Sequence, residues 1–363
     1  MIYYYYSIFI LILSFTQITN IKKNIKLLVY ILMGIIVIII AGLRYDTGTD
    51  YWNYFEQYQM VKEYGFAIWY EPLYVSMILM AQSFNLEFYS FLFLFYSLTI
   101  FLLLYILPKL TPLWLLSFSI YALAFMPNNG MGTIRFGLAI VITLYAVKYA
   151  IEKKLLKFLF IVIVATLIHK AMIFFIIVYY IIHLKFTNVQ YMFIYIFAIL
   201  LGMTSIIENI FLATYDFTTN FLPFLGGYNV KMGSYIIGHQ EGSIALSSVI
   251  KKSFLLFYFL YYRKQILTVY PHYNSYLNIV VFGYSIYFVM INTFATFAIR
   301  LSSMFSFYEM ILLPLPLLVL HKRINILLLY LFIFILSLMK FAITIMSWQD
   351  YFFPYQNLLE FLI

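Results

Sequence analysis

The sequence has no cysteine and few charged residues. The absence of cysteine excludes disulfide bonds, thiolate metal sites and cysteine catalysis. Charged residues make up 10% of the 363 residues, whereas about a quarter is usual in a soluble domain. Hydrophobic residues make up 65%, and they form repeated apolar runs of about 14–23 residues. Together these features predict an all-α polytopic integral membrane protein.

Several chemical motifs are also missing. The chain has no phosphate-binding P-loop, no glycine-rich dinucleotide turn, no G-x-S-x-G nucleophile turn and no metal-ligand spacing. We therefore expect neither a metal nor a cofactor. The net charge is +9, but lysine and arginine are spread singly over the predicted loops and form no basic stripe. This distribution fits membrane topology and argues against nucleic-acid binding.

Short basic loops indicate which segments face the cytoplasm. They contain Lys22, Lys23, Lys26, Lys153, Lys154, Lys157, Lys185, Arg263, Lys264, Lys322 and Arg323. Placing them all inside predicts about 12 transmembrane helices, with a range of roughly 11–14, in one domain over residues 1–363 with both termini outside. The expected spans are 3–19, 27–43, 88–107, 113–127, 134–151, 155–168, 171–184, 190–212, 245–262, 275–297, 302–320 and 324–346.

Two outer loops are expected, at about residues 44–87 and 213–247. Within the first, residues 72–84 are apolar but lie between Glu71 and Glu87. They fall short of the roughly 20 residues that cross a bilayer upright. We therefore predict a re-entrant or interfacial helix there, and a tight hairpin further on with His169 and Lys170 at its outer tip.

Polar residues gather on the predicted outer side. They are Arg44, Asp46, Asp50, Arg135, His169, Lys170, His239 and Arg300. Structural explanations exist for each type: an arginine can reach lipid headgroups, an aspartate can cap a helix, and a histidine can cap a hairpin.

Residues 42–54, GLRYDTGTDYWNY, hold the densest group of these polar residues. Gly48 and Thr49 fit a turn that starts a short helix at Asp50. Tyr51, Tyr54 and Tyr58 then share one face of that helix. This face is either an interfacial aromatic belt or a platform for sugar rings.

Outer arginines at a membrane boundary suit phosphate, because the guanidinium fork pairs with phosphate oxygens. A lipid-linked diphosphate presents such oxygens at this depth. If it is the leaving group, arginines also stabilise the charge that develops on it. A nearby carboxylate or histidine can take the proton from a sugar hydroxyl. The pattern therefore favours metal-independent glycosyl transfer.

The stretch LRYDTGTDYWNYF resembles the R-x-x-x-G-T-D-x-x-x-Y signature of the Wzy-type (EpsG-like) polysaccharide polymerases. Three later stretches are similar to family segments in the same order: TIRFGLAIVITLYA, ATLIHKAMIFFIIVYY and AIRLSSMFSFYEMILLP. Phe136 stands where the family usually has glutamine, and no serine follows His169. The resemblance covers about residues 30–320.

The resemblance implies a GT-C-like protein of the bacterial inner membrane with its active site on the outer (periplasmic) face. Such a protein transfers an undecaprenyl-diphosphate-linked glycan, the donor, onto a new lipid-linked repeat unit, the acceptor. Membrane lipid and a chain-length regulator are the other expected partners. O-antigen and capsule-type polysaccharides are the expected products.

The matching motifs carry the following expected roles. Arg135 and Arg300 hold the diphosphate, with Arg44 and Lys170 assisting. Asp50 or His169 is the catalytic base. Sugars bind at Asp46, Tyr51, Tyr54 and His239.

Three alternatives remain, one of them a structural membrane subunit that catalyses no reaction. An O-antigen ligase, or another transferase of lipid-linked sugars, shares the donor and the outer arginines, but an early G-T-D motif favours the polymerase. A flippase would place ionisable residues near the midplane, often in two repeated halves. The sequence shows neither feature.

Overall fold

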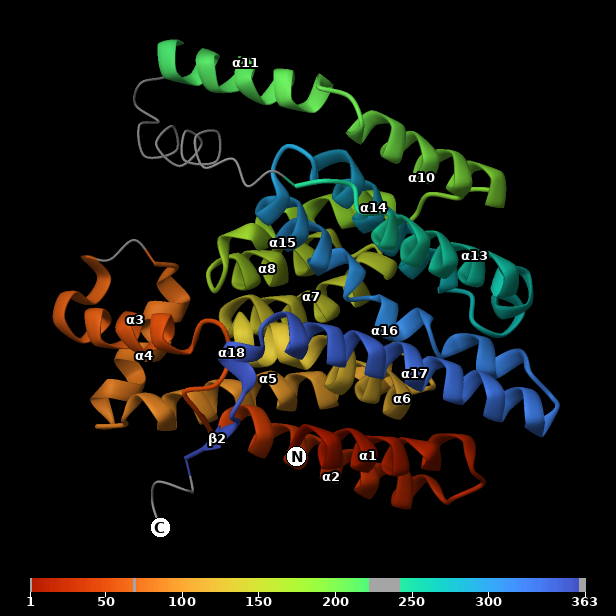
Figure 1. The fold of residues 1–363 in the computed structure, drawn as a ribbon, viewed down its shortest axis with the longest axis horizontal. Coiled ribbons are helices and arrows are strands. Elements are labelled where there is room, and N and C mark those ends of the chain that lie inside the picture. Colours follow the sequence, from red (N-terminus) through yellow and green to blue (C-terminus); the bar gives the residue numbers. More distant parts are fainter. Residues whose placement is uncertain (1, 68–69, 222–241, 359–363) are drawn as a thin grey trace. The chain divides into compact units, whose positions relative to one another are not determined.

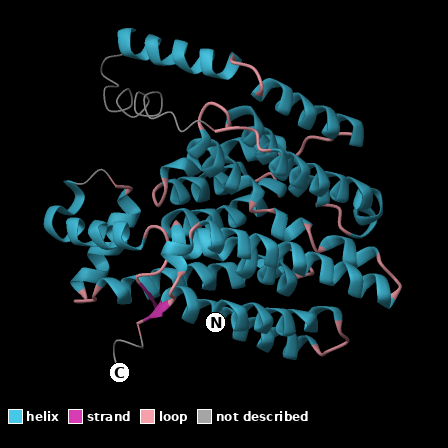
Figure 2. Cartoon of the chain, viewed as in Figure 1, coloured by secondary structure: helices cyan, strands magenta, loops and turns pink. Residues whose placement is uncertain are grey.

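The computed structural model describes residues 2–67, 70–221 and 242–358, and most of these residues lie in helices (Figure 2). The chain divides into two compact units. The first unit consists of Met1–Tyr179 and Met310–Ile363, and the second of Tyr180–Glu309. This division does not test the prediction of one membrane domain over residues 1–363, which stays a prediction.

The first unit holds both ends of the chain (Figure 1). In chain order its elements are α1 (Ile2–Phe15), η1 (Thr16–Ile18), α2 (Lys23–Gly42), β1 (Arg44–Tyr45), α3 (Tyr51–Tyr64), η2 (Gly65–Ala67), α4 (Pro72–Ser83), α5 (Phe88–Leu110), α6 (Trp114–Ile120), the π-helix η3 (Tyr121–Gly132), α7 (Ile134–Ile151), α8 (Leu155–Thr166), η4 (Lys170–Ile177), η6 (Leu315–Val319), α17 (Arg323–Ser347), α18 (Gln349–Phe352) and β2 (Gln356–Asn357). Short α9 (Val178–Ile181) and α16 (Glu309–Leu312) cross between the units.

Packing within the first unit joins segments that are far apart in sequence. Helix α2 packs on α5, α7 packs on α5 and α8, and α17 packs on η3. The N-terminal helix is tied to the C-terminal segment, because the Tyr3 hydroxyl donates to the Phe352 carbonyl at 3.2 Å. The Tyr3 ring also contacts Phe353 and Tyr355 edge to face. The two ends of the described chain therefore lie together, as expected for termini on one side of a membrane.

The second unit consists of α10 (Asn188–Gly202), α11 (Ile206–Phe221), α13 (Leu246–Val269), α14 (Tyr273–Met290) and α15 (Ala295–Ser306), with parts of α9 and α16. Helix α14 is its centre, packed on α10, α13 and α15. The buried Asn278 side chain donates to the carbonyls of Ile181 and Leu184 at 2.8 and 2.9 Å and accepts from the Tyr191 hydroxyl. A buried amide with these partners fixes the α10–α14 contact without leaving a polar group unsatisfied.

Each of the twelve expected spans contains helix, and α7 matches the expected 134–151 at both ends. By length and hydropathy, however, the described residues contain five helices able to cross a membrane, or six if the pair α10–α11, bent by 64°, is one span. The other segments are too short, broken or too polar: α8 has 12 residues, and α13 contains four basic residues. The chain is a helical membrane protein, and the count of about 12 is not confirmed.

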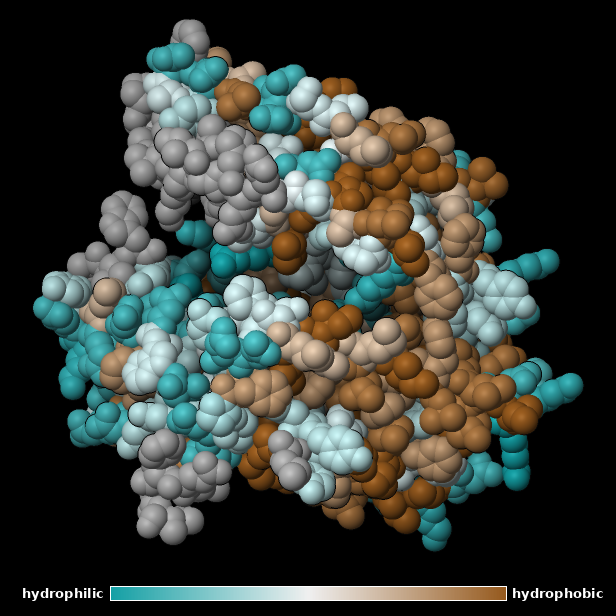
Figure 3. All heavy atoms as spheres, viewed as in Figure 1, coloured by the Kyte–Doolittle hydropathy of each residue, from teal (hydrophilic) through white to brown (hydrophobic). Residues whose placement is uncertain are grey.

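The predicted outer loop 44–87 contains two helices. Helix α3 begins after Asp50 as expected, and α4 covers the short apolar segment. At about 1.5 Å per residue, the 12 residues of α4 reach only about 18 Å, too short to cross. Figure 3 shows hydrophilic residues gathered over α3 and α4, in contrast to the hydrophobic surface of α17. Much of the second expected loop, 213–247, lies outside the described residues.

Candidate active site in the first unit

The loop after α2 is anchored by Arg44. This side chain is 1% exposed. Its Nε donates to the Thr47 carbonyl at 2.8 Å, and its Nη1 donates to the Ala41 carbonyl. Burial lowers the pKa of Arg44, although an arginine still remains protonated. The structure thus places Arg44 beneath the loop, where it bonds to backbone carbonyls.

The C-terminal segment closes over the same loop. Strand β2 pairs antiparallel with β1, so that Arg44 faces Asn357. The Gly48 N–H donates to the Tyr351 carbonyl at 2.7 Å, and the Gln356 N–H donates to the Thr47 hydroxyl at 3.2 Å. Two regions about 300 residues apart are therefore one structural element.

Gly48 is required at its position for two reasons. Its φ of +104° is a conformation that residues with a side chain rarely adopt. A Cβ atom there would also lie 2.2 Å from the Met131 carbonyl oxygen. The G-T-D turn therefore packs directly on η3, the irregular helix that precedes Arg135.

Helix α3 carries the expected tyrosine face, and it points inward. Tyr51, Tyr54 and Tyr58 are 3%, 4% and 3% exposed. Burial raises the pKa of Tyr51 to about 12, so its hydroxyl is neutral at physiological pH. Trp52, next to Tyr51 on the same helix, is instead 49% exposed.

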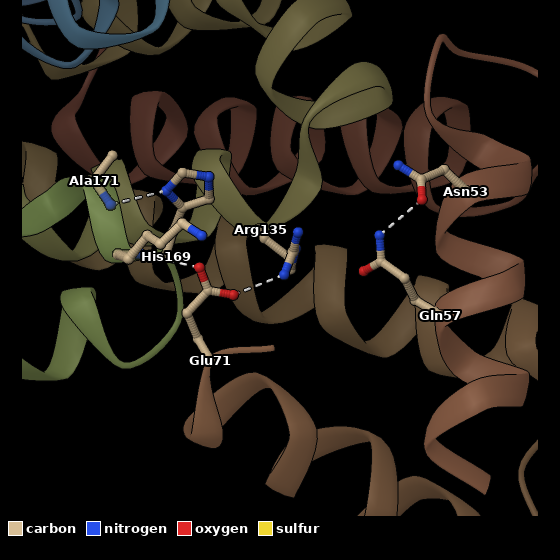
Figure 4. Close-up of polar contacts among 7 residues, drawn as sticks. Asn53, Gln57, Glu71, Arg135, His169 and Ala171 are labelled. Carbon is tan, nitrogen blue, oxygen red and sulfur yellow. Dashed lines mark hydrogen bonds and ion pairs between the residues drawn. The ribbon is translucent and has the colours of Figure 1, made fainter. Parts of the chain in front are cut away.

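Arg135 forms an ion pair that links three separate sequence motifs (Figure 4). Its Nη1 donates to Glu71 Oε2 at 2.8 Å, and the two side chains are 15% and 12% exposed. The other oxygen of Glu71 accepts from the Lys170 N–H at 3.1 Å. The Leu73 N–H also donates to the Leu167 carbonyl at 3.0 Å, which holds the start of α4 against the α8–η4 turn.

Tyrosine rings surround the Arg135 guanidinium. Its Cζ lies 4.8, 5.4 and 5.8 Å from the ring centroids of Tyr74, Tyr70 and Tyr54. Contacts at this range are favourable for a cation. Within the described chain, Arg135 Nε and the Tyr74 hydroxyl are buried and have no hydrogen-bond partner. Two buried donors without protein partners can bond to water or to a bound ligand.

Asp50 and Arg135 both act on Tyr54. Burial raises the pKa of Tyr54; the nearby Arg135 opposes this shift, and Asp50 adds to it. Asp50 itself is the residue before α3 and is half-buried. One tyrosine hydroxyl is therefore within electrostatic range of a carboxylate and a guanidinium from two different motifs.

His169 is the cap of η4, at the predicted hairpin tip. Its Nδ1 accepts from the Ala171 N–H at 3.4 Å (Figure 4). Its ring also meets the Phe136 ring edge to face at 5.1 Å. A neutral histidine whose Nδ1 accepts carries its proton on Nε2. In this state His169 is a hydrogen-bond donor at Nε2 rather than a base there.

The remaining predicted residues lie elsewhere. Asp46 is exposed and accepts from the Trp52 indole N–H. Lys170 follows His169 with an exposed side chain. Arg300 is exposed on α15 of the second unit. His239 lies outside the described residues.

Sequence reasoning missed Glu71, Tyr74 and Trp52 as site residues. Glu71 was recognised only as a polar boundary of a short helix. The useful signal was the Glu-Pro pair at that helix start: Pro72 favours extended backbone at Glu71 and begins α4. Among the described residues, no three His, Cys, Asp or Glu side chains are grouped as metal ligands.

The site therefore joins the G-T-D helix, the Arg135 helix and the His169 turn. The family of the chain follows from a comparison of its sequence with protein families. The sequence matches the EpsG family over residues 27–357. The chain belongs to the EpsG family. The match covers every motif described above, including the C-terminal strand of the EpsG-family chain.

Family membership confirms the resemblance and indicates a membrane protein of the polysaccharide-polymerase type. No curated protein and no solved structure matches this EpsG-family chain. The GT-C-like fold stays a prediction.

Proposed function

We propose that this chain is a polysaccharide polymerase that joins undecaprenyl-diphosphate-linked repeat units at the outer face of the bacterial inner membrane. The observation that carries the proposal is the environment of Arg135. The Arg135 guanidinium contacts one carboxylate and three tyrosine rings, and among the described residues its own Nε and the Tyr74 hydroxyl are buried donors without a protein partner. Phosphate oxygens are acceptors that suit both of these donors.

In the proposed reaction, a hydroxyl of the acceptor sugar attacks the anomeric carbon of the donor glycan. The bond from that carbon to the diphosphate breaks, and undecaprenyl diphosphate leaves with the bonding electrons. Arg135 stabilises the charge that develops on the leaving group. Arg300 stays the second phosphate-binding arginine of the proposal, on sequence grounds alone.

Asp50 is our choice for the base that takes the hydroxyl proton. It lies within range of Tyr54 and hence near the Arg135 environment, and a carboxylate only accepts hydrogen bonds. His169, with Nδ1 occupied by the Ala171 N–H, is better suited to donate from Nε2 to a phosphate oxygen. Glu71 is a positioning residue, because it holds Arg135 from the opposite helix.

The proposal is tested by deleting the gene and separating the surface glycan by length on a gel. Complementation with the wild-type chain should restore a ladder, and Arg135→Ala should leave a single capped repeat unit despite normal membrane insertion. This pattern means that export and attachment survive without polymerisation. Loss of all surface glycan, with lipid-linked material accumulating, would instead favour a ligase or a flippase.

A further inference from the structure

A cavity lies beside the G-T-D turn, in the first unit. It has a volume of about 170 Å³. Its lining combines the turn and α3, through Asp46, Trp52 and Asn53, with the C-terminal segment, through Asp350, Tyr351 and Gln356. None of the roles proposed for Arg135, Glu71 or His169 uses this space.

The size of the cavity suits one six-membered ring. A protein cavity of about 150 Å³ accepts benzene, whereas sites for drug-sized ligands occupy roughly 300–1,000 Å³. A single pyranose ring therefore fits this space, and a disaccharide would have to extend out of it. In the proposed reaction, the glycan is built from sugars on the outer side. A site that holds one ring can therefore recognise one sugar of this glycan.

The Trp52 side chain is fixed before any ligand arrives. Its indole N–H donates to Asp46 Oδ1, and its ring meets Tyr51 and Phe55 edge to face at 5.5 and 5.6 Å. It is nevertheless 49% exposed and lines the cavity. A rigid, half-open indole is a suitable surface for the apolar face of a sugar ring.

The polar lining favours one class of sugar. Asp46 and Asp350 supply carboxylate oxygens, which accept bonds from sugar hydroxyls. Among the described residues, no lysine, arginine or histidine lines the cavity. A sugar acid would therefore bring its own carboxylate next to two others without a counter-ion in the lining, and like charges at a binding surface are costly.

We infer that this cavity is a binding site for one uncharged pyranose, the sugar at the end of the acceptor glycan, with Trp52 as its stacking surface and Asp46 and Asp350 as its hydroxyl acceptors. The assignment of this sugar to the acceptor rests on the proposed polymerase function. The C-terminal segment is then part of the specificity of the enzyme. Asp350 and Gln356 select the sugar, although they lie about 300 residues from the G-T-D motif.

The direct test is saturation-transfer NMR on the full-length protein in lipid nanodiscs free of sugar detergents. The probes are the methyl glycosides of glucose, galactose, N-acetylglucosamine and glucuronic acid. We expect at least one neutral glycoside to bind with millimolar Kd and the glucuronide to bind at least 10-fold more weakly. Trp52→Ala should abolish saturation transfer to the glycosides. Asp350→Asn should narrow the difference in Kd between the neutral glycosides and the glucuronide.

Trp348→Ala is the matched control. Trp348 is 50% exposed, like Trp52, but does not line the cavity. The control should bind like wild type. Three results would overturn the inference: no transfer to any neutral glycoside, equal binding of the glucuronide, or wild-type binding by Trp52→Ala.

A kinetic test separates this inference from the proposed function. With lipid-linked repeat units as substrate, Trp52→Ala and Asp350→Asn should raise KM for the acceptor several-fold and leave kcat nearly unchanged. If wild type polymerises and both variants keep the wild-type KM, the acceptor site is wrong and the polymerase stands. If wild type binds glycosides as expected but transfers nothing, the sugar site stands and the polymerase is wrong.

Discussion

Two arginines of the first unit illustrate how buried charge is used differently within one site. Arg44 bonds to the carbonyls of its own loop, whereas Arg135 pairs with Glu71 from another helix. The first arrangement fixes backbone. Arg135 can change partners, because phosphate oxygens accept the same charge-assisted hydrogen bonds as carboxylate oxygens. In the proposed function, Arg135 therefore acts on the diphosphate, and Arg44 holds the loop.

The close contact at Gly48 gives the first prediction. Gly48→Ala should destabilise the protein by about 2–4 kcal/mol, since it combines a positive φ with a collision against the Met131 carbonyl. Thermal unfolding in detergent should show a Tm lower by several degrees. Gly65→Ala is the control: its φ is +55°, but nothing lies within 4 Å of the added Cβ. An equal decrease in Tm for both variants would show that the contact with Met131 does not contribute to the destabilisation.

Removing the partner of Arg135 gives the second prediction. Glu71→Gln leaves a mostly buried guanidinium without its counter-ion, which costs about 3 kcal/mol in pairs of this kind. Polymerisation should fall at least 10-fold, with a lower Tm. Glu56→Gln, an exposed acid on α3, should retain wild-type stability and activity. A Glu71→Gln protein with unchanged stability and activity would refute the positioning role.

Sequence alone located part of this site. Asp50 before α3 and His169 at the hairpin tip were predicted from local patterns, and both positions are confirmed. The Arg135–Glu71 pair was out of reach, because it joins residues 64 positions apart that belong to no shared motif. The inward orientation of Tyr54 and Tyr58 was equally hidden, since periodicity identifies a face of a helix but not what covers it.

The elements that hold the site differ in how well they could be predicted. Long apolar helices such as α7 are visible in composition and were placed at both ends. The expected span 302–320 overlaps the candidate span Ala295–Val319, which is built of α15, α16 and η6 rather than of one regular helix. Pro314 and Pro316 cannot continue a regular hydrogen-bond ladder in its C-terminal part. The β1–β2 pair has two residues per strand, too few for any period to be read.

The C-terminal strand gives the third prediction. Gln356→Pro removes the N–H that donates to Thr47 and should release the segment from the G-T-D turn. Limited proteolysis should then cleave near residue 356 at least several-fold faster, and activity should fall. Gln356→Ala keeps the N–H and should resist the protease as wild type does. Equal protease resistance of the proline variant would mean that the pairing does not hold the segment.

At the scale of the whole molecule, the topology prediction states on which side of the membrane the polar motifs and the basic loops lie. The polar motifs and both chain ends come together in the first unit through Tyr3, Phe352 and the β1–β2 pair. Within the first unit, the basic loop before α2 lies at the opposite end of that helix, since α2 begins at Lys23 and ends at the G-T-D loop. This arrangement agrees with one polar outer side.

The absence of cysteine makes this fourth prediction direct to test. Single cysteines at four exposed positions should divide into two groups when a membrane-impermeant maleimide is added to right-side-out vesicles. Gln59→Cys and Gln349→Cys should react, whereas Lys157→Cys and Lys322→Cys should react only after permeabilisation. Labelling of Gln59→Cys and Lys157→Cys from the same side would contradict the predicted topology.

The most direct measurement of the central claim is polymerisation by the purified chain. Reconstituted in vesicles with lipid-linked repeat units, the wild-type protein should lengthen the glycan and release undecaprenyl diphosphate in equal number to the bonds formed. Arg135→Ala should lower kcat by about 100-fold to 1,000-fold, as the loss of a donor to developing charge does, while the protein stays folded. Failure of the wild type to lengthen the glycan, or wild-type rates from Arg135→Ala, would contradict the account.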